Sequence, residues 1–364
     1  MTPEITLEQL ETDPHPVLVA LRPIGWVPVL NGWLVTGREA ALQVMRDAET
    51  FTVDDLRFST GQVVGPSMLT RDGAEHARHR EPFAEPLRLA AVRERFAPLV
   101  EVEVDALIDG FEADGRAELR RSFAGPLAAR VVAQLLGLEV ADTSTMLGWY
   151  DAIVASVTGV AEGKQPSEAG AAAFESLRDT VEPALGSAAQ LTSAEVVSNA
   201  AVMMFGGIET TEGMIANLLY HLLTYVGGPV ESSLYANAVE ESLRLEPAAA
   251  VIDRYATRDV ELAGAEIGKG EFVEISLAGA NRDPAYFPDP DRFDLHRENA
   301  RHQIAFAHGP HVCVGMHLAR LEAHTAVERI FARLPGLRLD PDRPSAPRGL
   351  VFRKPPTLDA LWGI

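Results

Sequence analysis

The one cysteine of the chain, Cys313, lies in the segment 306–320, which reads FAHGPHVCVGMHLAR. Gly309 and Gly315 allow positive φ angles and close approach of the backbone on both sides of the sulfur. The residues from Met316 onward have helical spacing, so the sulfur is expected just before a helix, where unpaired N–H groups stabilise a thiolate. If Cys313 is considered without its neighbours, it could equally be a small apolar residue buried in the core.

A second segment whose residues could take part in chemistry is FGGIETTEG at 205–213, inside a helical pattern that spans 194–224. At about 1.5 Å per residue such a helix would be roughly 46 Å long and would cross a whole domain. Gly206 and Gly207 each lower the stability of a helix by about 1 kcal/mol relative to alanine. Glycines at this position therefore indicate that another group must approach the backbone closely. Glu209 in an apolar stretch is costly unless it is paired or functional. The alternative is a core helix whose threonine hydroxyls bond back to the preceding turn.

Charged pairs at helical spacing accompany these two runs. His76 and Arg80 are four residues apart, and Glu241 and Arg244 are three apart, so each pair shares one helix face. Such pairs are usually solvated surface charges of small energetic value. Taken singly, none of them identifies a site.

Together, the runs resemble the cytochrome P-450 family. The haem-binding loop of that family is matched at eight of the fifteen positions of 306–320, namely Phe306, Gly309, His311, Cys313, Gly315, Leu318, Ala319 and Arg320. Residues 207–210 resemble the oxygen-activating motif Gly-x-Asp/Glu-Thr, and residues 241–244 resemble the Glu-x-x-Arg pair. The motifs follow the order of the family, and the match runs from about Asp13 to Pro355.

The resemblance implies haem b as cofactor, with Cys313 as the proximal thiolate ligand of the iron. A thiolate ligand favours O–O cleavage, and N–H donors to the sulfur tune it. The catalytic residues implied are Thr210, which hydrogen-bonds the reacting oxygen, and Glu209, which relays protons from solvent. Gly206 and Gly207 would leave room for dioxygen. The full set of haem-binding residues implied is Cys313, His76, Arg80, Arg254, His311, Gly206, Gly207, Phe306 and Gly315.

Two further roles follow from the resemblance. His76, Arg80, Arg254 and His311 would supply cations to the two buried propionates, which otherwise carry a large desolvation cost. Glu241 and Arg244, with Arg292 as the third member, would clamp the loop that carries the thiolate. This clamp is structural rather than catalytic.

A substrate pocket is expected where the family places one: at 58–69, at 202–206 and at 248–252. These segments supply apolar and partly small side chains, so we expect a hydrophobic pocket for a compact aromatic or terpenoid-like molecule. Each of these side chains could equally belong to the core. The residues are Phe58, Val64, Val202, Phe205, Ala250 and Ile252.

Composition narrows the possible partners. The chain has 364 residues, with 32 Lys plus Arg against 52 Asp plus Glu, a net charge of −20. The negative electrostatic field of such a chain argues against nucleic acid and anionic membranes as binding partners. The longest apolar run, 200–208, is far shorter than the roughly 20 residues of a membrane span. With no signal-like start and no possible intramolecular disulfide, the chain is expected to be cytoplasmic.

Electrons for a monooxygenase must come from elsewhere. The chain has no dinucleotide fingerprint, and one cysteine cannot hold an iron–sulfur cluster. Separate proteins, a ferredoxin and a ferredoxin reductase, are therefore expected. Segments 71–95 and 292–322 each carry one more arginine than acids, so an acidic ferredoxin could dock there.

The elements that must position these residues are mainly helices. Helical patterns dominate from about 74 to 246, interrupted by a loop at 163–167. Strands are expected at 26–30 and 33–36, joined at Asn31-Gly32 as a hairpin, and at 260–262 and 272–275. Three prolines make 281–293 irregular. The fold class predicted is mainly α with small β-sheets (α+β), one P-450-type domain over 1–364, with haem between a long central helix and the cysteine-loop helix.

The function predicted is a haem-thiolate monooxygenase that inserts one atom of O2 into a small hydrophobic substrate. One alternative is the same fold acting as a peroxygenase or in a dehydration or coupling step, against which Glu209 and Thr210 speak. Another is a non-catalytic haem sensor, in which this acid–alcohol pair would have no purpose. A Cys-His hydrolase built on Cys313 and His311 lacks a third orienting group.

Overall fold

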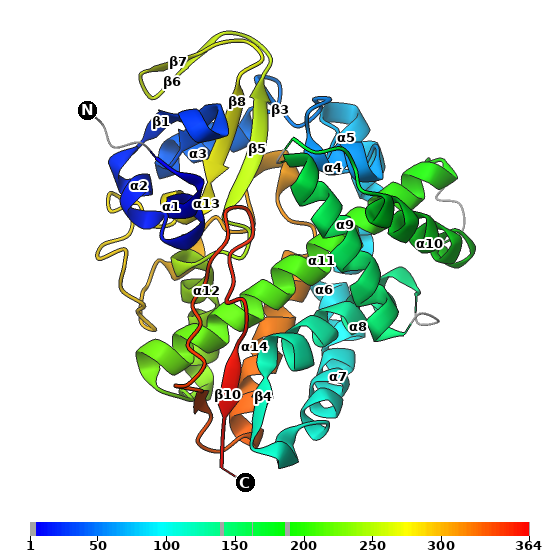
Figure 1. The fold of residues 1–364 in the computed structure, drawn as a ribbon, viewed down its shortest axis with the longest axis vertical. Coiled ribbons are helices and arrows are strands. Elements are labelled where there is room, and N and C mark those ends of the chain that lie inside the picture. Colours follow the sequence, from blue (N-terminus) through cyan, green and yellow to red (C-terminus); the bar gives the residue numbers. More distant parts are fainter. Residues whose placement is uncertain (1–4, 139–141, 162, 186–189, 364) are drawn as a thin grey trace.

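A 29-residue helix, α11 (Ser193–His221), runs through the middle of the molecule (Figure 1). Its start is fixed by a capping box, in which the side chains of Thr192 and Glu195 each accept a hydrogen bond from the other's backbone N–H. Buried residues follow one another around all sides of α11, as expected of a helix in the centre of a core. The helix predicted at 194–224 is confirmed, and its last residues form a π-helical turn at Leu222–Val226.

The computed structural model describes residues 5–138, 142–161, 163–185 and 190–363. Its helices are α1 (Leu7–Thr12), α2 (His15–Ala20), α3 (Arg38–Arg46), α4 (Ser59–Val64), α5 (Gly73–Ala84), α6 (Leu89–Ala91), α7 (Ala97–Asp109), α8 (Gly125–Leu136), α9 (Thr143–Ala161), α10 (Glu168–Leu185), α11, α12 (Tyr235–Leu245), α13 (Leu277–Ala280) and α14 (Met316–Arg333). Its strands are β1 (Ile24–Val27), β2 (Gly32–Val35), β3 (Phe51–Thr52), β4 (Arg116–Glu118), β5 (Val251–Ala256), β6 (Val260–Leu262), β7 (Ala265–Ile267), β8 (Phe272–Ser276), β9 (Arg338–Leu339) and β10 (Asp359–Leu361).

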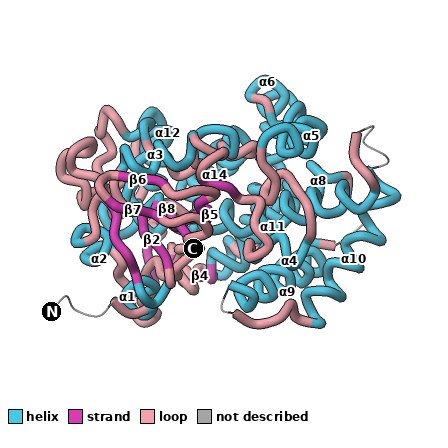
Figure 2. The backbone as a smooth tube through the Cα atoms, turned by 90° about the horizontal axis from the view of Figure 1, so that it is seen from above, coloured by secondary structure: helices cyan, strands magenta, loops and turns pink. Residues whose placement is uncertain are grey.

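The large sheet and the main group of helices lie on different sides of the molecule, although α3 and α13 pack on the sheet. Figure 2 shows the strands gathered on one side and α8, α9 and α10 on the other. The largest sheet has the strand order β1-β2-β8-β5-β3, in which only the β2–β8 pair is parallel. The main apolar cluster surrounds α11, which packs against α8, α10 and α14. The predicted mixture of many helices and small sheets is confirmed.

The predicted hairpin is present, but its strands are displaced. β1 and β2 pair in antiparallel register, with Val27 opposite Gly32. Residues 28–30, predicted as strand, form a 3-10 turn that begins at Pro28. Proline lacks the N–H that a strand would need and suits the first position of a helical turn. Asn31 then closes the turn in the left-handed conformation, at φ 47°.

Two segments predicted to be irregular are confirmed. Residues 163–167 connect α9 to α10. The proline-rich stretch after α13 contains only turns and bends until a short 3-10 turn at Ala300–His302. This stretch leads directly into the cysteine loop, so its conformation decides where the sulfur lies. In the described part of the chain, no helix is both long and apolar enough to cross a membrane.

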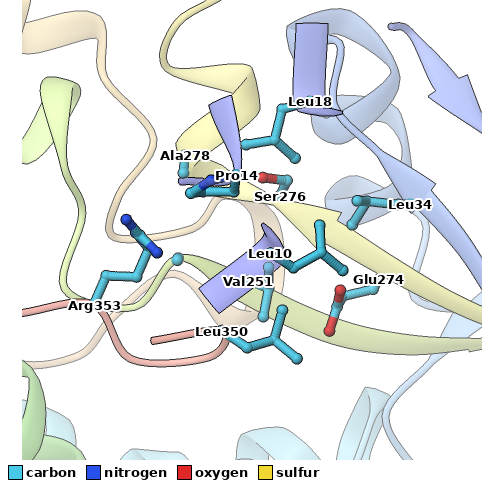
Figure 3. Close-up of a pocket in the computed structure, with 11 residues that line it drawn as sticks. Leu10, Pro14, Leu18, Leu34, Val251, Glu274, Ser276, Ala278, Leu350 and Arg353 are labelled. Atoms are coloured by element: carbon cyan, nitrogen blue, oxygen red, sulfur yellow. The ribbon is translucent and has the colours of Figure 1, made fainter. Parts of the chain in front are cut away.

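The large sheet carries two carboxyl groups in direct opposition. Asp253 on β5 pairs in register with Glu274 on β8. Glu274 is only 4% exposed, and its Oε2 atom has no hydrogen-bond partner among the described residues. Figure 3 shows it beside Val251 and Leu34, at a cavity of about 10 Å³, close to the least space that can hold one water molecule. Burial and the neighbouring Asp253 charge raise the pKa of Glu274 well above its ordinary value.

Replacing this carboxyl should change how stability depends on pH. A carboxyl with a raised pKa keeps a proton in the folded state that the unfolded chain releases, so unfolding free energy falls as pH rises above about 4.3. Between that pH and the folded-state pKa of Glu274, the unfolding free energy of the wild type should fall by about 1.4 kcal/mol per pH unit because of this group. Glu274→Gln should abolish this fall, because the amide does not titrate. Urea denaturation at several pH values tests this, with the exposed Glu266→Gln as control. Parallel pH profiles for wild type and Glu274→Gln would contradict it.

Candidate active site

The cysteine loop joins a 3-10 turn at Gly309–His311 to the start of α14. The backbone N–H of Cys313 donates to the carbonyl of Phe306 at 2.8 Å, which closes the loop. Gly309 adopts a φ of +75°, and a Cβ there would collide with the carbonyl oxygen of Met45 on α3. Gly309 therefore lets the loop pack on α3. Gly315 faces open space instead.

The partly buried Cys313 thiol receives opposing influences. Burial raises its pKa, while the Gly315 N–H and the charges of Arg80 and Arg320 act in the opposite direction. Arg320 also lies over the ring of Phe306, at 4.4 Å from its centre. The donors expected at a thiolate are thus in place, and a bound metal cation would favour the ionised sulfur further.

On α11, the predicted oxygen-activation run includes residues that are partly exposed. In the otherwise buried stretch 201–210, only Gly206, Gly207 and Thr210 are partly exposed. A Cβ at Gly206 would meet nothing within 4 Å. The Thr210 hydroxyl donates to the Gly206 carbonyl at 2.6 Å, which leaves its oxygen lone pairs available to accept.

The two neighbouring glycines, Gly206 and Gly207, have different surroundings. A Cβ at Gly207 would lie 2.7 Å from a methyl carbon of Val132 on α8. The expectation that both glycines leave room for a ligand is therefore wrong for Gly207, which permits close packing of two helices. Gly206 alone faces open space.

Glu209 lies on the same helix in a buried polar cluster. Its Oε1 atom is 2.7 Å from the Nζ atom of Lys354, and its Oε2 atom accepts a hydrogen bond from the Tyr150 hydroxyl on α9. The same ammonium also pairs with Glu212, one turn further along α11. The sequence showed Glu209 to be unusual, but it gave no spacing that pointed to Tyr150 or Lys354, which are distant in the chain.

Three of the predicted cationic groups meet beside the cysteine loop. The rings of His76 and His311 lie 4.2 Å apart. Arg80 donates to the carbonyl of Val312 at 2.7 Å. Arg254, 4% exposed on β5, donates to the carbonyl of Asp253, and no carboxylate of the described residues pairs with it.

Asp72, which no sequence motif singled out, lies beside His311. His311 is 2.7 Å from Asp72, which also accepts hydrogen bonds from the hydroxyl of Thr52 and the backbone N–H of Val53. Although burial opposes it, these hydrogen bonds lower the pKa of Asp72 to about 2. Its place just before α5 marks a helix cap, yet its side chain makes no capping bond and faces His311 instead.

His76 is the least satisfied member of the group. Burial, then the charges of His311 and Arg80, lower its pKa to about 4, so the isolated ring is neutral at pH 7. Its Nε2 atom is buried without a hydrogen-bond partner among the described residues. A buried polar atom of this kind normally has a partner, so this ring nitrogen is suited to bind a polar group of a cofactor.

Comparison with known proteins identifies the family. The cytochrome P450 family model matches residues 233–357. Across 98% of this chain and 91% of the relative, the sequence is 34% identical to the cytochrome P450 monooxygenase PikC of Streptomyces venezuelae. The chain belongs to the cytochrome P450 family. It is therefore an oxidoreductase of the P450 monooxygenase type, a class that uses a haem-thiolate cofactor, dioxygen and redox partners.

Other relatives and solved structures agree with this assignment. Pentalenic acid synthase of Streptomyces avermitilis is 34% identical over 87% of this chain and 85% of its own length. The crystal structure of CalO2 superposes with a TM-score of 0.88 at 27% identity, covering 98% of each chain. P450BioI in complex with an acyl carrier protein gives a TM-score of 0.85 at 27% identity, covering 98% of this chain and all of the other. The fold is thus the P450 fold.

The described residues fit the haem that the family implies. Two glycines, Gly206 and Gly315, face open space on α11 and at the start of α14, which pack against each other. His76 has an unpartnered ring nitrogen, and Arg80 and Arg254 donate to backbone carbonyls without a paired carboxylate. Haem carries two carboxylates that need such donors. The donor set and the space therefore suit this group.

The clamp on the cysteine loop has a different third member from the one predicted. Arg244 pairs with Glu241 at 2.7 Å, and both side chains are fully buried. The second partner of Glu241 is Arg297, at 3.0 Å, whereas Arg292 is exposed. Only the backbone carbonyl of Arg292 takes part, as an acceptor for both guanidinium groups. The assignment of Arg292 is therefore wrong.

The six predicted substrate residues lie in several clusters. Val64 and Val202 belong to the main cluster around α11, and Phe205, which lies outside that cluster, contacts Phe352 in an edge-to-face pair. Ala250 packs with the N-terminal helices, and Ile252 with the cluster at α3. Phe58 packs against Tyr255. Val64 and Val202 share the large main cluster and the other four residues lie outside it, so one shared pocket stays a prediction.

The corrected clamp makes a testable distinction between two arginines. Arg297→Lys keeps the charge but loses the planar fork that contacts Glu241 and three carbonyls, so unfolding free energy should fall by about 3 kcal/mol or more. The exposed Arg292→Lys should change it by less than about 0.5 kcal/mol. Urea denaturation of both variants gives the comparison. Equal losses, or a larger loss at Arg292, would contradict the assignment.

Proposed function

We propose that this P450 is a haem b monooxygenase that inserts one atom of O2 into a small hydrophobic substrate. The observation that carries the proposal is the partial exposure of Gly206 and Thr210 in a buried helix that packs on the cysteine-loop helix. Space and a hydroxyl thus occur where oxygen chemistry would need them. The whole chain, 1–364, would act as one domain.

Each residue has a role defined by its surroundings. Cys313 would ligate the iron, and haem held by a thiolate supplies activation of dioxygen. Gly206 would admit the oxygen molecule, and the Thr210 hydroxyl would turn its proton from the Gly206 carbonyl to donate a hydrogen bond to it. Glu209 would deliver protons taken from solvent, because cleavage of the O–O bond with loss of water consumes two protons.

Cations around the cysteine loop would bind the propionates. His311 pairs with the one carboxylate here, Asp72, whose charge also acts on His76 and Arg254, while the charge of Arg80 acts on the His76 ring. The surplus positive charge suits two further carboxylates. A propionate close to the His76 ring would favour its protonated form, in opposition to burial.

Substrate and electron donor are inferred from chemistry. The relatives include an enzyme named vitamin D(3) 25-hydroxylase, 31% identical over 90% of this chain, besides the pentalenic acid synthase. Both names, and the apolar side chains at the six predicted positions, support a hydrophobic substrate. A ferredoxin and its reductase would supply electrons, because the sequence contains neither a dinucleotide fingerprint nor cluster cysteines.

The absorption spectrum tests the cofactor directly. Purified protein, reduced and exposed to carbon monoxide, should show the strongly red-shifted Soret band of thiolate-ligated haem. Cys313→His should keep haem and lose that shift, because imidazole is not a thiolate. A normal Soret position in the wild type would refute thiolate ligation, and absence of haem would refute the proposed function.

A second test concerns proton delivery. Thr210→Ala should release peroxide and lower product formed per electron by roughly tenfold or more, because the reacting oxygen loses its hydrogen-bond partner. Thr211→Ala is the matched control, since Thr211 is a buried neighbour with the same side chain. Both are assayed with a surrogate ferredoxin and reductase and a compound that displaces water from the iron. Full coupling in Thr210→Ala would refute the role of this hydroxyl.

A further inference from the structure

One ammonium group serves two buried carboxylates on α11. Lys354 lies between Glu209 and Glu212, and its Nζ atom pairs with both. Side-chain exposure is 5% for Glu209, zero for Glu212 and 11% for Lys354. The chain has only three lysines, so a compact charge at this position contrasts with its arginine-rich composition.

The surroundings of the cluster are shaped to hold it. A Cβ at Gly125 on α8 would lie 2.8 Å from an oxygen of Glu212, and a Cβ at Gly213 would contact the Lys354 side chain at 3.5 Å. Glycines on two helices thus leave the volume that the ion pairs occupy. Figure 1 shows the C-terminal segment, in red, passing across α11, which is how residue 354 reaches this helix.

The cluster also continues to the surface. Glu212 lies 3.3 Å from Arg120 and 3.7 Å from Arg121. Arg121 pairs at 3.2 Å with the half-exposed Asp151, the residue that follows Tyr150 on α9. A continuous series of charged groups therefore connects solvent to Glu209.

The double pairing has a consequence for proton transfer. To carry a proton, Glu209 gains it from solvent, loses its charge, turns to the Thr210 hydroxyl, passes the proton on and returns as a carboxylate. If Lys354 had no other partner, this movement would leave an unpaired buried ammonium, which is strongly disfavoured. Glu212 keeps the ammonium paired while Glu209 is away.

We propose that Lys354 and Glu212 are positioning residues that hold Glu209 and free it for proton delivery. This inference rests on the proposed function, in which Glu209 relays protons. Lys354 fixes the resting position of Glu209 from one side, and the Tyr150 hydroxyl fixes it from the other. Glu212 makes the release of Glu209 possible.

Amine acetylation of the intact protein tests the shared ammonium. Under a pulse of acetic anhydride, peptide mass spectrometry should show Lys354 reacting at least about tenfold slower than the exposed Lys269, because it reacts only when the cluster opens. Glu209→Gln alone and Glu212→Gln alone should each keep this protection, since one carboxylate remains. The double variant should lose it.

Two labelling outcomes would overturn the proposal. Loss of protection in Glu209→Gln alone would mean that Glu212 does not hold the ammonium. Protection that persists in the folded double variant would mean that packing rather than pairing shields Lys354. Should the double variant fail to fold, the two single variants and Lys354→Arg decide, because arginine keeps the charge and should preserve thermal stability better than Lys354→Gln.

The functional consequence is measured on the holoenzyme. In Glu212→Gln, the ammonium has Glu209 as its remaining acidic partner, so release of Glu209 should become harder. The solvent deuterium isotope effect on electron consumption should rise, and peroxide released per electron should increase severalfold, while the carbon-monoxide spectrum stays unchanged. Lys269→Gln is the control. Wild-type values in Glu212→Gln would overturn the role of Glu212.

Failure of the proposed function would be recognisable separately. Absence of thiolate-ligated haem in the wild type refutes the monooxygenase assignment, whereas the acetylation pattern concerns the ion pairs alone. Conversely, a normal P450 spectrum with Lys354 as reactive as Lys269 would refute the shared pairing and leave the monooxygenase assignment intact.

Discussion

The buried contact of Glu241 with Arg244 and Arg297 is the interaction on which the site depends most. Residues 281–299, between α13 and the cysteine loop, form no helix or strand that could satisfy their carbonyl groups, and buried carbonyls without partners are costly. Two guanidinium groups supply the missing donors. The carbonyls that accept from them are those of Asn281, Pro288, Asp289, Pro290 and Arg292. A planar fork is suited to this task because its donors point in fixed directions.

This clamp explains how an irregular coil can place a metal ligand. One carboxylate between two guanidinium groups leaves a positive surplus, and the carbonyl oxygens of the coil partly compensate it. Removing one member of the clamp would leave both an unpaired buried charge and carbonyl groups without hydrogen-bond donors. Loss of one partner from a buried ion pair is strongly destabilising. The cysteine loop is then held from the other side by α3, at Gly309. The position of Cys313 follows from these two constraints.

The sequence predicted the long central helix, the cysteine loop and the acid–threonine pair because each is local, with its residues close together in the chain. It did not predict Asp72, Tyr150 or Lys354 as partners, because their contacts join residues 59 to 239 positions apart. The error at Arg292 has the same origin. In an irregular coil no fixed period relates neighbouring side chains, so spacing could not tell which arginine turns inward. Gly207 was misassigned because sequence alone does not say which side of a helix faces α8.

The polar residues of α11 show where the fold accepts a cost for chemistry. A helix buried on all sides is stabilised most by apolar side chains. Within two turns, however, α11 contains two glycines, two carboxylates and the hydroxyl of Thr210. Each is compensated by something specific: Gly207 by contact with α8, Glu209 by Tyr150, and Glu212 by Lys354 and the neighbouring arginines. Among the described residues, Gly206 and Thr210 have no such partner on another element: a Cβ at Gly206 would meet nothing within 4 Å, and the hydroxyl of the partly exposed Thr210 bonds within its own helix, to the Gly206 carbonyl. The uncompensated positions therefore mark the side of the helix where a ligand, rather than another helix, completes the core.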